Sequence, residues 1–372
     1  MKKIVLHLTM LFIFTVSVAQ IENYDQLKKQ GKLTGKENRV RSTKSITPVF
    51  KQSGVTPQPL SSCQCWQTVD ATWQVVPFEF SSPPDYRNDD ESSPLINIPF
   101  TFCFYGTNYT SLYINNNGNI SFSGPNPVYS ANPFPDPTYD MVAPFWGDVD
   151  TWDPGSGLVY YKVTATYMIV QWDTVGYYDA YSDKRNTFQL IISNGTDPII
   201  PNGNNVSFCY KDMQWTTGDA SGGVNGFGGF PATVGVNKGD GINYIQFGTF
   251  DQPGGAYDGP YGNPDGISWL DNKSFFINTC SSTNIPPVAN GLVYCDTITL
   301  CVGDTLDFNI IFHSPELGQI TTATAITNLS GFTIINNTPA NNVVFDAQLI
   351  AQAVDVGNNT ITFSAVDDGA PV

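Results

Sequence analysis

The sequence contains few charged residues and almost no histidine. Charged side chains make up 13% of the 372 residues, about half the share of ~25% that is typical of soluble domains. Of the two histidines, His7 lies in an apolar N-terminal leader, so the mature chain keeps only His313. A Ser-His-Asp hydrolase or a histidine-ligated zinc site would have to use this single residue. His313 follows an apolar strand candidate, and we interpret it as an exposed turn residue.

Amphipathic helices and membrane-length apolar runs are also missing. No segment shows an apolar stripe at 3.6-residue spacing over ten positions. The apolar run Ile4–Val18 follows two lysines and precedes small residues, which is typical of a secretory signal peptide. It is shorter than the ~20 residues that a membrane span needs. We predict that residues 1–19 are a signal peptide, that no transmembrane segment follows its cleavage, and that the mature protein is secreted, extracellular or on the cell surface.

The charge is unevenly distributed along the chain. Residues 21–60 carry eight Lys or Arg and three acidic residues. The chain from Ser61 onward carries seven Lys or Arg and thirty acidic residues. A body this acidic repels phosphate backbones, which excludes nucleic acid as a partner. Residues 20–62 are basic and polar with little apolar periodicity, so we predict a flexible N-terminal arm.

Glycine and proline are abundant, at 33 and 26 residues, and favour short strands with tight turns. Asn115–Asn119 contains Asn-Gly between two apolar segments, which is a strong hairpin signal. Further strands are predicted at residues 158–163, 167–172, 188–192, 206–210, 233–236 and 275–277. We therefore predict an all-β fold, with one β-sandwich domain at residues 63–280.

Residues 281–287 (SSTNIPP) have the composition of a linker. Beyond them, strand candidates at 307–312 and 360–366 predict a smaller β-sandwich at residues 288–372. This segment resembles the immunoglobulin-like modules of large bacterial surface proteins. Because the sequence stops where such a module normally adds a strand, we expect an incomplete module, with a sorting or anchoring domain beyond Val372.

The seven cysteines lack the paired CxxC spacing of metal sites, so we expect disulfides in an oxidising compartment. Cys103 and Cys209 occupy similar strand-like segments, and we predict that they pair. A bond from Cys63 or Cys65 to Cys280 would join the two ends of the larger domain. The odd number leaves one thiol free or bonded outside this sequence.

The most informative stretch is Met141–Val163, in which an apolar segment is followed by closely spaced aspartates, a tight turn and a strand. Two other motifs, Phe100–Gly106 and Ile114–Phe122, precede it. Further matches follow at residues 168–172, 186–190 and 232–236. Over residues 95–280 this order resembles the nidogen-like (NIDO) extracellular domain.

The resemblance implies an extracellular module associated with cell–matrix adhesion and implies no catalytic site. We expect an adhesion protein that binds extracellular matrix, polysaccharide or a surface protein. A carbohydrate-binding module of a polymer-degrading system is the alternative, and a secreted hydrolase is the third interpretation. The glycine-rich inserts at 217–230 and 251–266 are where we expect specificity to reside.

Asp148, Asp150 and Asp153 are candidate calcium ligands, because a hard cation prefers closely spaced oxygen ligands. Their spacing differs from that of an EF-hand, and the same aspartates could instead bind backbone N–H groups in turns. A glycoside hydrolase needs a carboxylate pair, but no pair stands out among so many acids. We interpret the acidic stretch Pro83–Glu91 as a solvated loop.

Aromatic residues in loop-like contexts are candidate ligand contacts, because flat rings bury area while few rotamers are lost. The alternative is that these rings pack over strand edges. The candidates are Trp152, Tyr177, Tyr178, Tyr181, Tyr257 and Tyr261.

Overall fold

The computed structural model describes residues 27–32, 45–46, 66–257, 265–280, 287–290, 300–314 and 318–369. The predicted signal peptide, most of the predicted linker, Cys63, Cys65 and Tyr261 lie outside these ranges. Strands make up nearly all of the regular structure that is described, which confirms the all-β prediction. No helix in the described ranges has the length and apolar character needed to cross a membrane.

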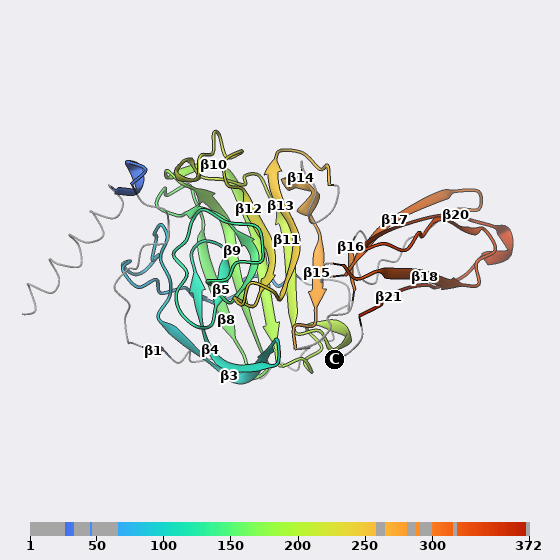
Figure 1. The fold of residues 1–372 in the computed structure, drawn as a ribbon, viewed down its shortest axis with the longest axis horizontal. Helices are drawn as coiled ribbons and strands as arrows, with labels where there is room; N and C mark the ends of the chain where they lie inside the picture. The colour runs from blue at the N-terminus through green and yellow to red at the C-terminus, as the bar shows by residue number, and fades with distance from the viewer. Residues whose placement is uncertain are drawn as a thin grey trace, which may run out of the picture.

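Two sheets form the larger sandwich (Figure 1). The first has the order β1-β3-β4-β5-β6-β12-β13-β14, with β1 (Ser45–Ile46), β3 (Leu95–Phe104), β4 (Thr107–Asn115), β5 (Asn119–Ser121), β6 (Met141–Trp146), β12 (Ala232–Asn237), β13 (Tyr244–Gln252) and β14 (Asp265–Gly266). The second has the order β15-β11-β10-β9-β8-β2, with β7 beside β9. Its strands are β2 (Gln74–Val75), β7 (Val149–Asp150), β8 (Leu158–Val163), β9 (Tyr167–Tyr177), β10 (Tyr181–Ser193), β11 (Val206–Asp212) and β15 (Ser274–Ile277).

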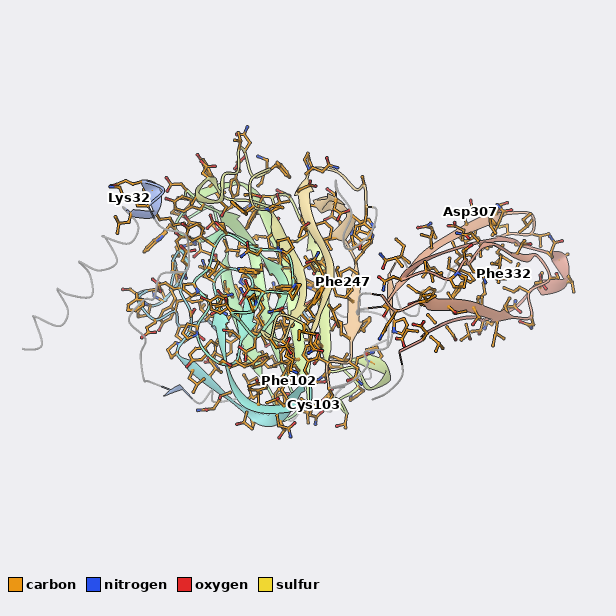
Figure 2. The ribbon with its side chains drawn as sticks, viewed as in Figure 1. Lys32, Phe102, Cys103, Phe247, Asp307 and Phe332 are labelled. Carbon is orange, nitrogen blue, oxygen red and sulfur yellow. A yellow bond between two sulfur atoms is a disulfide. The ribbon has the colours of Figure 1, made fainter. Side chains whose placement is uncertain are left out.

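The core lies between the two sheets and is rich in aromatic rings. Along β3, every second side chain from Ile96 to Phe104 is buried, as expected for a strand with one face on a core. Phe145 of the first sheet meets Phe188 of the second with ring centroids 5.3 Å apart. Figure 2 shows Phe102 and Phe247 among the side chains of this sandwich. The two sheets therefore share one apolar interior.

The predicted Asn-Gly hairpin is present between β4 and β5, with Asn115 paired to Asn119. Gly118 has a φ of +75°, and a Cβ there would lie 1.7 Å from the carbonyl oxygen of Phe145. Both the left-handed conformation and the close approach require glycine at this position.

Connecting loops gather at the two ends of the sandwich. Trp146 at the end of β6 pairs with Thr233 near the start of β12, whereas Met141 and Asn237 pair at the opposite end. We call the first end, with residues 85–91, 147–157, 178–180 and 216–231, the loop end. The β12–β13 turn at residues 238–243 lies at the opposite end.

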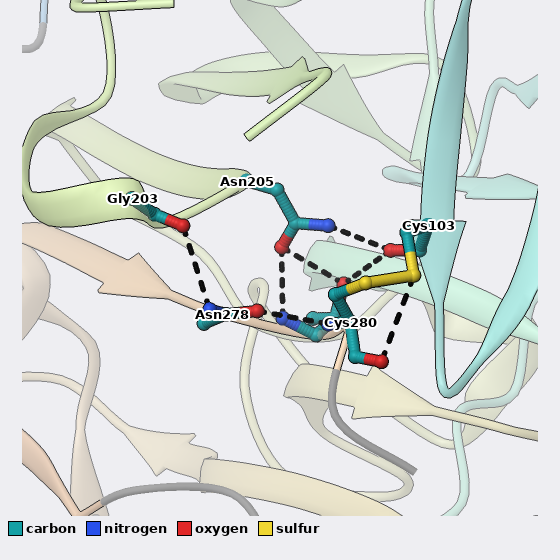
Figure 3. Close-up of a disulfide and its surroundings, with 6 residues drawn as sticks. Cys103, Gly203, Asn205, Asn278 and Cys280 are labelled. Atoms are coloured by element: carbon teal, nitrogen blue, oxygen red, sulfur yellow. Dashed lines mark hydrogen bonds between the residues drawn. A yellow bond between two sulfur atoms is a disulfide. The ribbon is translucent and has the colours of Figure 1, made fainter. Parts of the chain in front are cut away.

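A disulfide joins Cys103 to Cys280 at the end opposite the loop end (Figure 3). Cys209 is also disulfide-bonded, to a cysteine other than Cys103. The predicted pairs Cys103–Cys209 and Cys63 or Cys65 with Cys280 are therefore wrong. Strand alternation explains the error, because Cys103 lies between the inward-facing Phe102 and Phe104 on the first sheet. Cys209 lies in a separate apolar cluster of the second sheet, outside the shared core.

Residues beyond the linker form a second, smaller pair of sheets. One has the order β16-β17-β20-β19 and the other pairs β18 with β21. Phe345 and Phe363 connect the two sheets, with ring centroids 5.6 Å apart. This confirms a second β region, while its immunoglobulin-like identity stays a prediction. The strands are β16 (Val288–Asn290), β17 (Thr305–His313), β18 (Thr321–Thr327), β19 (Phe332–Asn336), β20 (Asn342–Ile350) and β21 (Ile361–Asp367).

The interpretation of His313 as a turn residue is wrong, because it is the last residue of β17. It pairs with Asn342 of β20 and with Val288 of β16. The strand extends because both neighbours offer ladder partners, which the sequence around Pro315 does not reveal.

The long-range disulfide leads to a stability prediction. Replacing Cys103 and Cys280 by serine should lower the free energy of unfolding by about 2–4 kcal/mol, because the bond restricts the unfolded chain. The loop it closes spans 177 residues. Urea denaturation of the full chain measures the change. Cys301→Ser is the control, since Cys301 is a free, exposed thiol; an equal loss in both proteins would contradict the prediction.

Candidate functional site

The loop end holds a fully buried lysine. The Nζ atom of Lys28 donates hydrogen bonds to Asp89 Oδ2 at 2.8 Å, Asp90 Oδ2 at 2.8 Å and Asp148 Oδ1 at 2.9 Å. These four side chains are at most 1% exposed. Charge-assisted bonds of this length are strong, and they offset the cost of removing a lysine from water.

Two tyrosine rings complete the surroundings of this ammonium group. The ring centroids of Tyr129 and Tyr178 lie 4.2 Å and 4.1 Å from Lys28 Nζ. Ring faces attract a cation through their quadrupole, most strongly where water is excluded. We name the five surrounding side chains the ammonium pocket: Asp89, Asp90, Tyr129, Asp148 and Tyr178.

Loops of the sandwich position the carboxylates of the pocket. Asp89 forms an isolated β-bridge with Asp150, which brings the loop before β3 against the β6–β8 connection. Asn117 Nδ2 donates to Asp90 Oδ1 at 2.7 Å. The Oδ1 atom of Asn117 accepts a bond from the Val149 amide at 3.0 Å. The hairpin asparagine therefore fixes Asp90 and the segment next to Asp148 together.

Lys28 is presented by a short turn in the predicted N-terminal arm. Leu27–Lys29 form a single helical turn. The Gly31 amide donates to the Lys28 carbonyl at 2.8 Å, with Gly31 at a φ of +63°. Lys29 pairs with Asp179 at 3.0 Å on the surface. At least this piece of the arm is ordered against the loop end.

Burial dominates the electrostatics of the cluster. It raises the pKa of Asp148 to about 7 and that of Asp150 to about 6, although the Lys28 charge opposes the first shift and backbone hydrogen bonds oppose the second. Burial and the charge of Asp90 raise the pKa of Asp89 well above its usual value. For Lys28, burial favours a lower pKa, but the surrounding carboxylates outweigh it and raise the pKa. One ammonium group thus faces several buried carboxylates, and its charge does not bring their pKa values back to the ordinary range.

The structure separates the three aspartates that were predicted to bind calcium. Only Asp148 lies in the ammonium pocket. Asp150 accepts bonds from the amides of Trp152 and Ala180, at 2.7 Å and 2.8 Å. Asp153 accepts from the Gly155 amide at 2.6 Å and from a serine hydroxyl. Asp150 and Asp153 thus make the turn-forming contacts that were the alternative, and calcium binding by this set stays a prediction.

The carboxylates that do approach one another are those of Asp89, Asp90 and Asp148. Their oxygen atoms lie within 4.8 Å of one another, close enough to share a metal ion. The Lys28 ammonium occupies the centre of this set in the structure. The three carboxylates therefore bind a cation that belongs to the same chain, the Lys28 ammonium.

The acidic stretch Pro83–Glu91 is solvated only in its first part, because Pro83–Asp85 are exposed whereas the three later acids are buried. Asp89, Asp90 and Glu91 are 3%, 1% and 2% exposed. Glu91 accepts bonds from the Phe80 amide and from a serine hydroxyl. Composition alone suggested solvation, because the partners of these acids come from distant segments. Lys28 was missed for the same reason, since 120 residues separate it from Asp148.

The aromatic candidates divide by exposure. Trp152 is 45% exposed, whereas Tyr177 and Tyr178 are buried. Tyr257 is half-buried and stacks on Trp269, with ring centroids 3.6 Å apart. Of the candidates within the described ranges, Trp152 and Tyr181, which is 41% exposed, are thus available to a ligand, and Tyr178 serves the ammonium pocket.

A groove of about 510 Å³ lies beside the pocket, between the β9–β10 turn and the 216–231 loop. Its lining includes Tyr181, Asp219, Val224 and Asn225. Tyr181 is 41% and Val224 71% exposed. We call the exposed side chains at this end the loop-end surface: Trp152, Tyr181, Val224 and Phe230.

The two sheets and the exposed side chains of the loop end place the larger domain in the class of β-sandwich domains. Comparison with known proteins identifies the family. The chain belongs to the NIDO-related family, whose model matches residues 66–254. This confirms the predicted NIDO resemblance, and family membership supports an extracellular, adhesion-like role in general terms.

Several animal proteins are similar to this region. Human alpha-tectorin is 32% identical over 200 residues, which cover 46% of this chain and 9% of alpha-tectorin. Nidogen of Drosophila melanogaster is 29% identical over 162 residues, which cover 36% of this chain and 12% of that nidogen. Mouse nidogen-1 is 33% identical over 137 residues, covering 28% and 11%. The chain thus matches only a small part of these relatives, and no solved structure matches it.

The family match ends before the second β region. It therefore leaves the immunoglobulin-like and bacterial-surface interpretations as predictions.

The raised pKa of Asp148 leads to a pH prediction. The folded protein keeps this carboxyl protonated to about pH 7, whereas the unfolded chain loses the proton near its ordinary pKa of ~3.9. Its contribution to stability is therefore present at low pH and is lost as pH rises through 7. Between pH 5 and 8, wild type should lose roughly 1–3 kcal/mol more unfolding free energy than Asp148→Asn.

Chemical denaturation at each pH measures this difference. Asp153→Asn is the matched control, because Asp153 is only half-buried and its hydrogen bonds lower its pKa. It titrates below the tested range, so this variant should keep the wild-type slope. Identical slopes for wild type and Asp148→Asn would contradict the prediction.

Proposed function

We propose that this chain is a secreted or cell-surface adhesion module that attaches through its loop-end surface to an extracellular-matrix or surface protein. One observation carries the proposal. Among the exposed large hydrophobic side chains of residues 66–257 and 265–280, all but Ile242 lie at the loop end. Clustered apolar exposure at the end of a rigid scaffold is a common mark of a protein-binding site.

The loops that carry this surface are held in place by the sandwich. The Phe230 amide donates to the Ser221 carbonyl at 2.9 Å, and the Thr216 amide donates to the Gly226 carbonyl at 2.8 Å. The indole of Trp215 is buried and donates to the Val175 carbonyl at 3.0 Å. A preorganised surface loses less conformational entropy when a partner binds.

The chemistry of the loop end supports binding rather than turnover. A hydrolase would need carboxylates open to a substrate and to water. Here Asp89, Asp90 and Asp148 are buried, and Lys28 lies between them. The same charges therefore stabilise the fold of the loop end.

A carbohydrate ligand is the second candidate, for which the groove offers suitable chemistry. Tyr181 is exposed beside Asp219, and its hydroxyl donates to Asp219 Oδ2 at 3.2 Å. Asn225 lines the same groove. A ring flanked by carboxylate and amide groups can stack on a sugar and bind its hydroxyls.

Binding to a panel of purified matrix proteins tests the proposal. We expect the full chain to bind at least one of them, and Trp152→Ala combined with Tyr181→Ala to weaken this binding at least about tenfold. Ile242→Ser is the matched control, because Ile242 is 77% exposed at the opposite end. Equal loss in the control would refute a loop-end site.

A glycan array separates the two candidates. Selective binding there, with no matrix protein bound, would favour the carbohydrate module. Turnover of a polysaccharide by the isolated chain would overturn both.

A further inference from the structure

The ammonium pocket matches the three donors of a primary amine. An ammonium group has three N–H bonds and no acceptor. Lys28 Nζ contacts three separate carboxylates, those of Asp89, Asp90 and Asp148, at 2.8, 2.8 and 2.9 Å, and it also lies 3.0 Å from the second oxygen of Asp89. The second oxygen of Asp148 is buried without a hydrogen-bond partner, so Lys28 does not satisfy every polar atom of the pocket.

The two rings distinguish an alkylammonium ligand from a metal ion. Calcium takes 6–8 oxygen ligands at 2.3–2.6 Å, and ring faces contribute none of these. Tyr129 and Tyr178 instead place their faces about 4 Å from the cation, as in sites that bind amines through aromatic cages. The combination of carboxylates and rings therefore favours a lysine side chain.

The sandwich builds this pocket from its own segments, whereas the lysine comes from outside the matched family region. Residues 66–254 match the family, and Lys28 precedes them. The Tyr178 amide donates to the Asp148 carbonyl at 3.2 Å, and the Asp219 amide donates to the Tyr178 carbonyl at 3.0 Å. These bonds fix the pocket walls to each other without using Lys28.

The lysine is the main described anchor of its segment. The neighbouring Lys29–Asp179 pair has side chains that are 56% and 39% exposed, and exposed pairs contribute little to stability. Lys28, in contrast, is fully buried. The turn at residues 27–32 is short, so the insertion of the Lys28 side chain into the ammonium pocket is the main contact that holds this segment to the domain.

We propose that the ammonium pocket is a recognition site for a lysine side chain carried on a peptide turn. The chain's own Lys28 fills the site as a tethered ligand, and a lysine-bearing peptide of the same sequence competes for it in trans. The proposal concerns a separate site from the loop-end surface and stands whether or not that surface mediates adhesion.

Amine-reactive footprinting of the folded full chain tests the resident ligand. Acetylation followed by mass spectrometry should modify Lys28 at least about tenfold more slowly than Lys29, since a buried charge pair must open first. In the double variant Asp89→Asn, Asp90→Asn, the rate at Lys28 should rise toward that at Lys29, with near-UV circular dichroism confirming the fold. Equal rates in the wild type would overturn the proposal.

Competition tests recognition in trans. An isotope-labelled peptide of residues 22–34, added in excess, should speed modification of the chain's own Lys28. The same peptide with Lys28→Gln, which keeps Lys29 and Lys32, should not. Failure of the unsubstituted peptide, or an equal effect of both peptides, would overturn the proposal.

The variant Lys28→Glu and the addition of calcium complete the experiment. Full-length Lys28→Glu places a fourth carboxylate against the pocket and should vacate it, so it should bind the labelled peptide at least about tenfold more tightly than wild type does. Equal affinities would contradict the assignment. If millimolar calcium exposes Lys28 and the peptide does not, the pocket is a metal site and the proposal is wrong.

Discussion

The structure of the larger domain depends on the desolvation of one continuous aromatic core by two sheets. Each strand has two faces, and the side chains that alternate inward must meet those of the opposite sheet. Phe145 and Phe188 make such a contact across the interior. When the inward-facing side chains of both sheets are packed together, the positions of the outward-facing residues, the strand ends and the loops are fixed as well. The disulfides and the loop end follow from this arrangement.

At the loop end the same physics operates on charge. Removing Asp89, Asp90 and Asp148 from water disfavours their ionised forms, and among the described residues of the domain no lysine pairs with the cluster. The compensating charge comes from Lys28, in the basic segment before the domain. The opposite charges of the N-terminal segment and the body are thus connected by a specific contact.

Much of the fold could be predicted from local sequence, because strand alternation and turn chemistry are local. The strand at Leu158–Val163 has the predicted bounds, and the hairpin at Asn115–Asn119 is present. The Cys103–Cys280 bond could not be predicted, because similar strand motifs do not reveal which sheet face a cysteine occupies. The ammonium pocket was missed because acids adjacent in sequence look solvated until a distant lysine is placed among them.

The covalent link between Cys103 and Cys280 has a mechanical consequence. Cys280 follows β15 of the second sheet, and Cys103 lies in β3 of the first. Tension applied from the C-terminal side reaches Cys280 and is then shared between strands of both sheets. Pulling therefore loads the sandwich as a whole, and β15 is not peeled alone from the sheet edge. The Cys103–Cys280 bond therefore carries force applied beyond Cys280 into both layers of the sandwich.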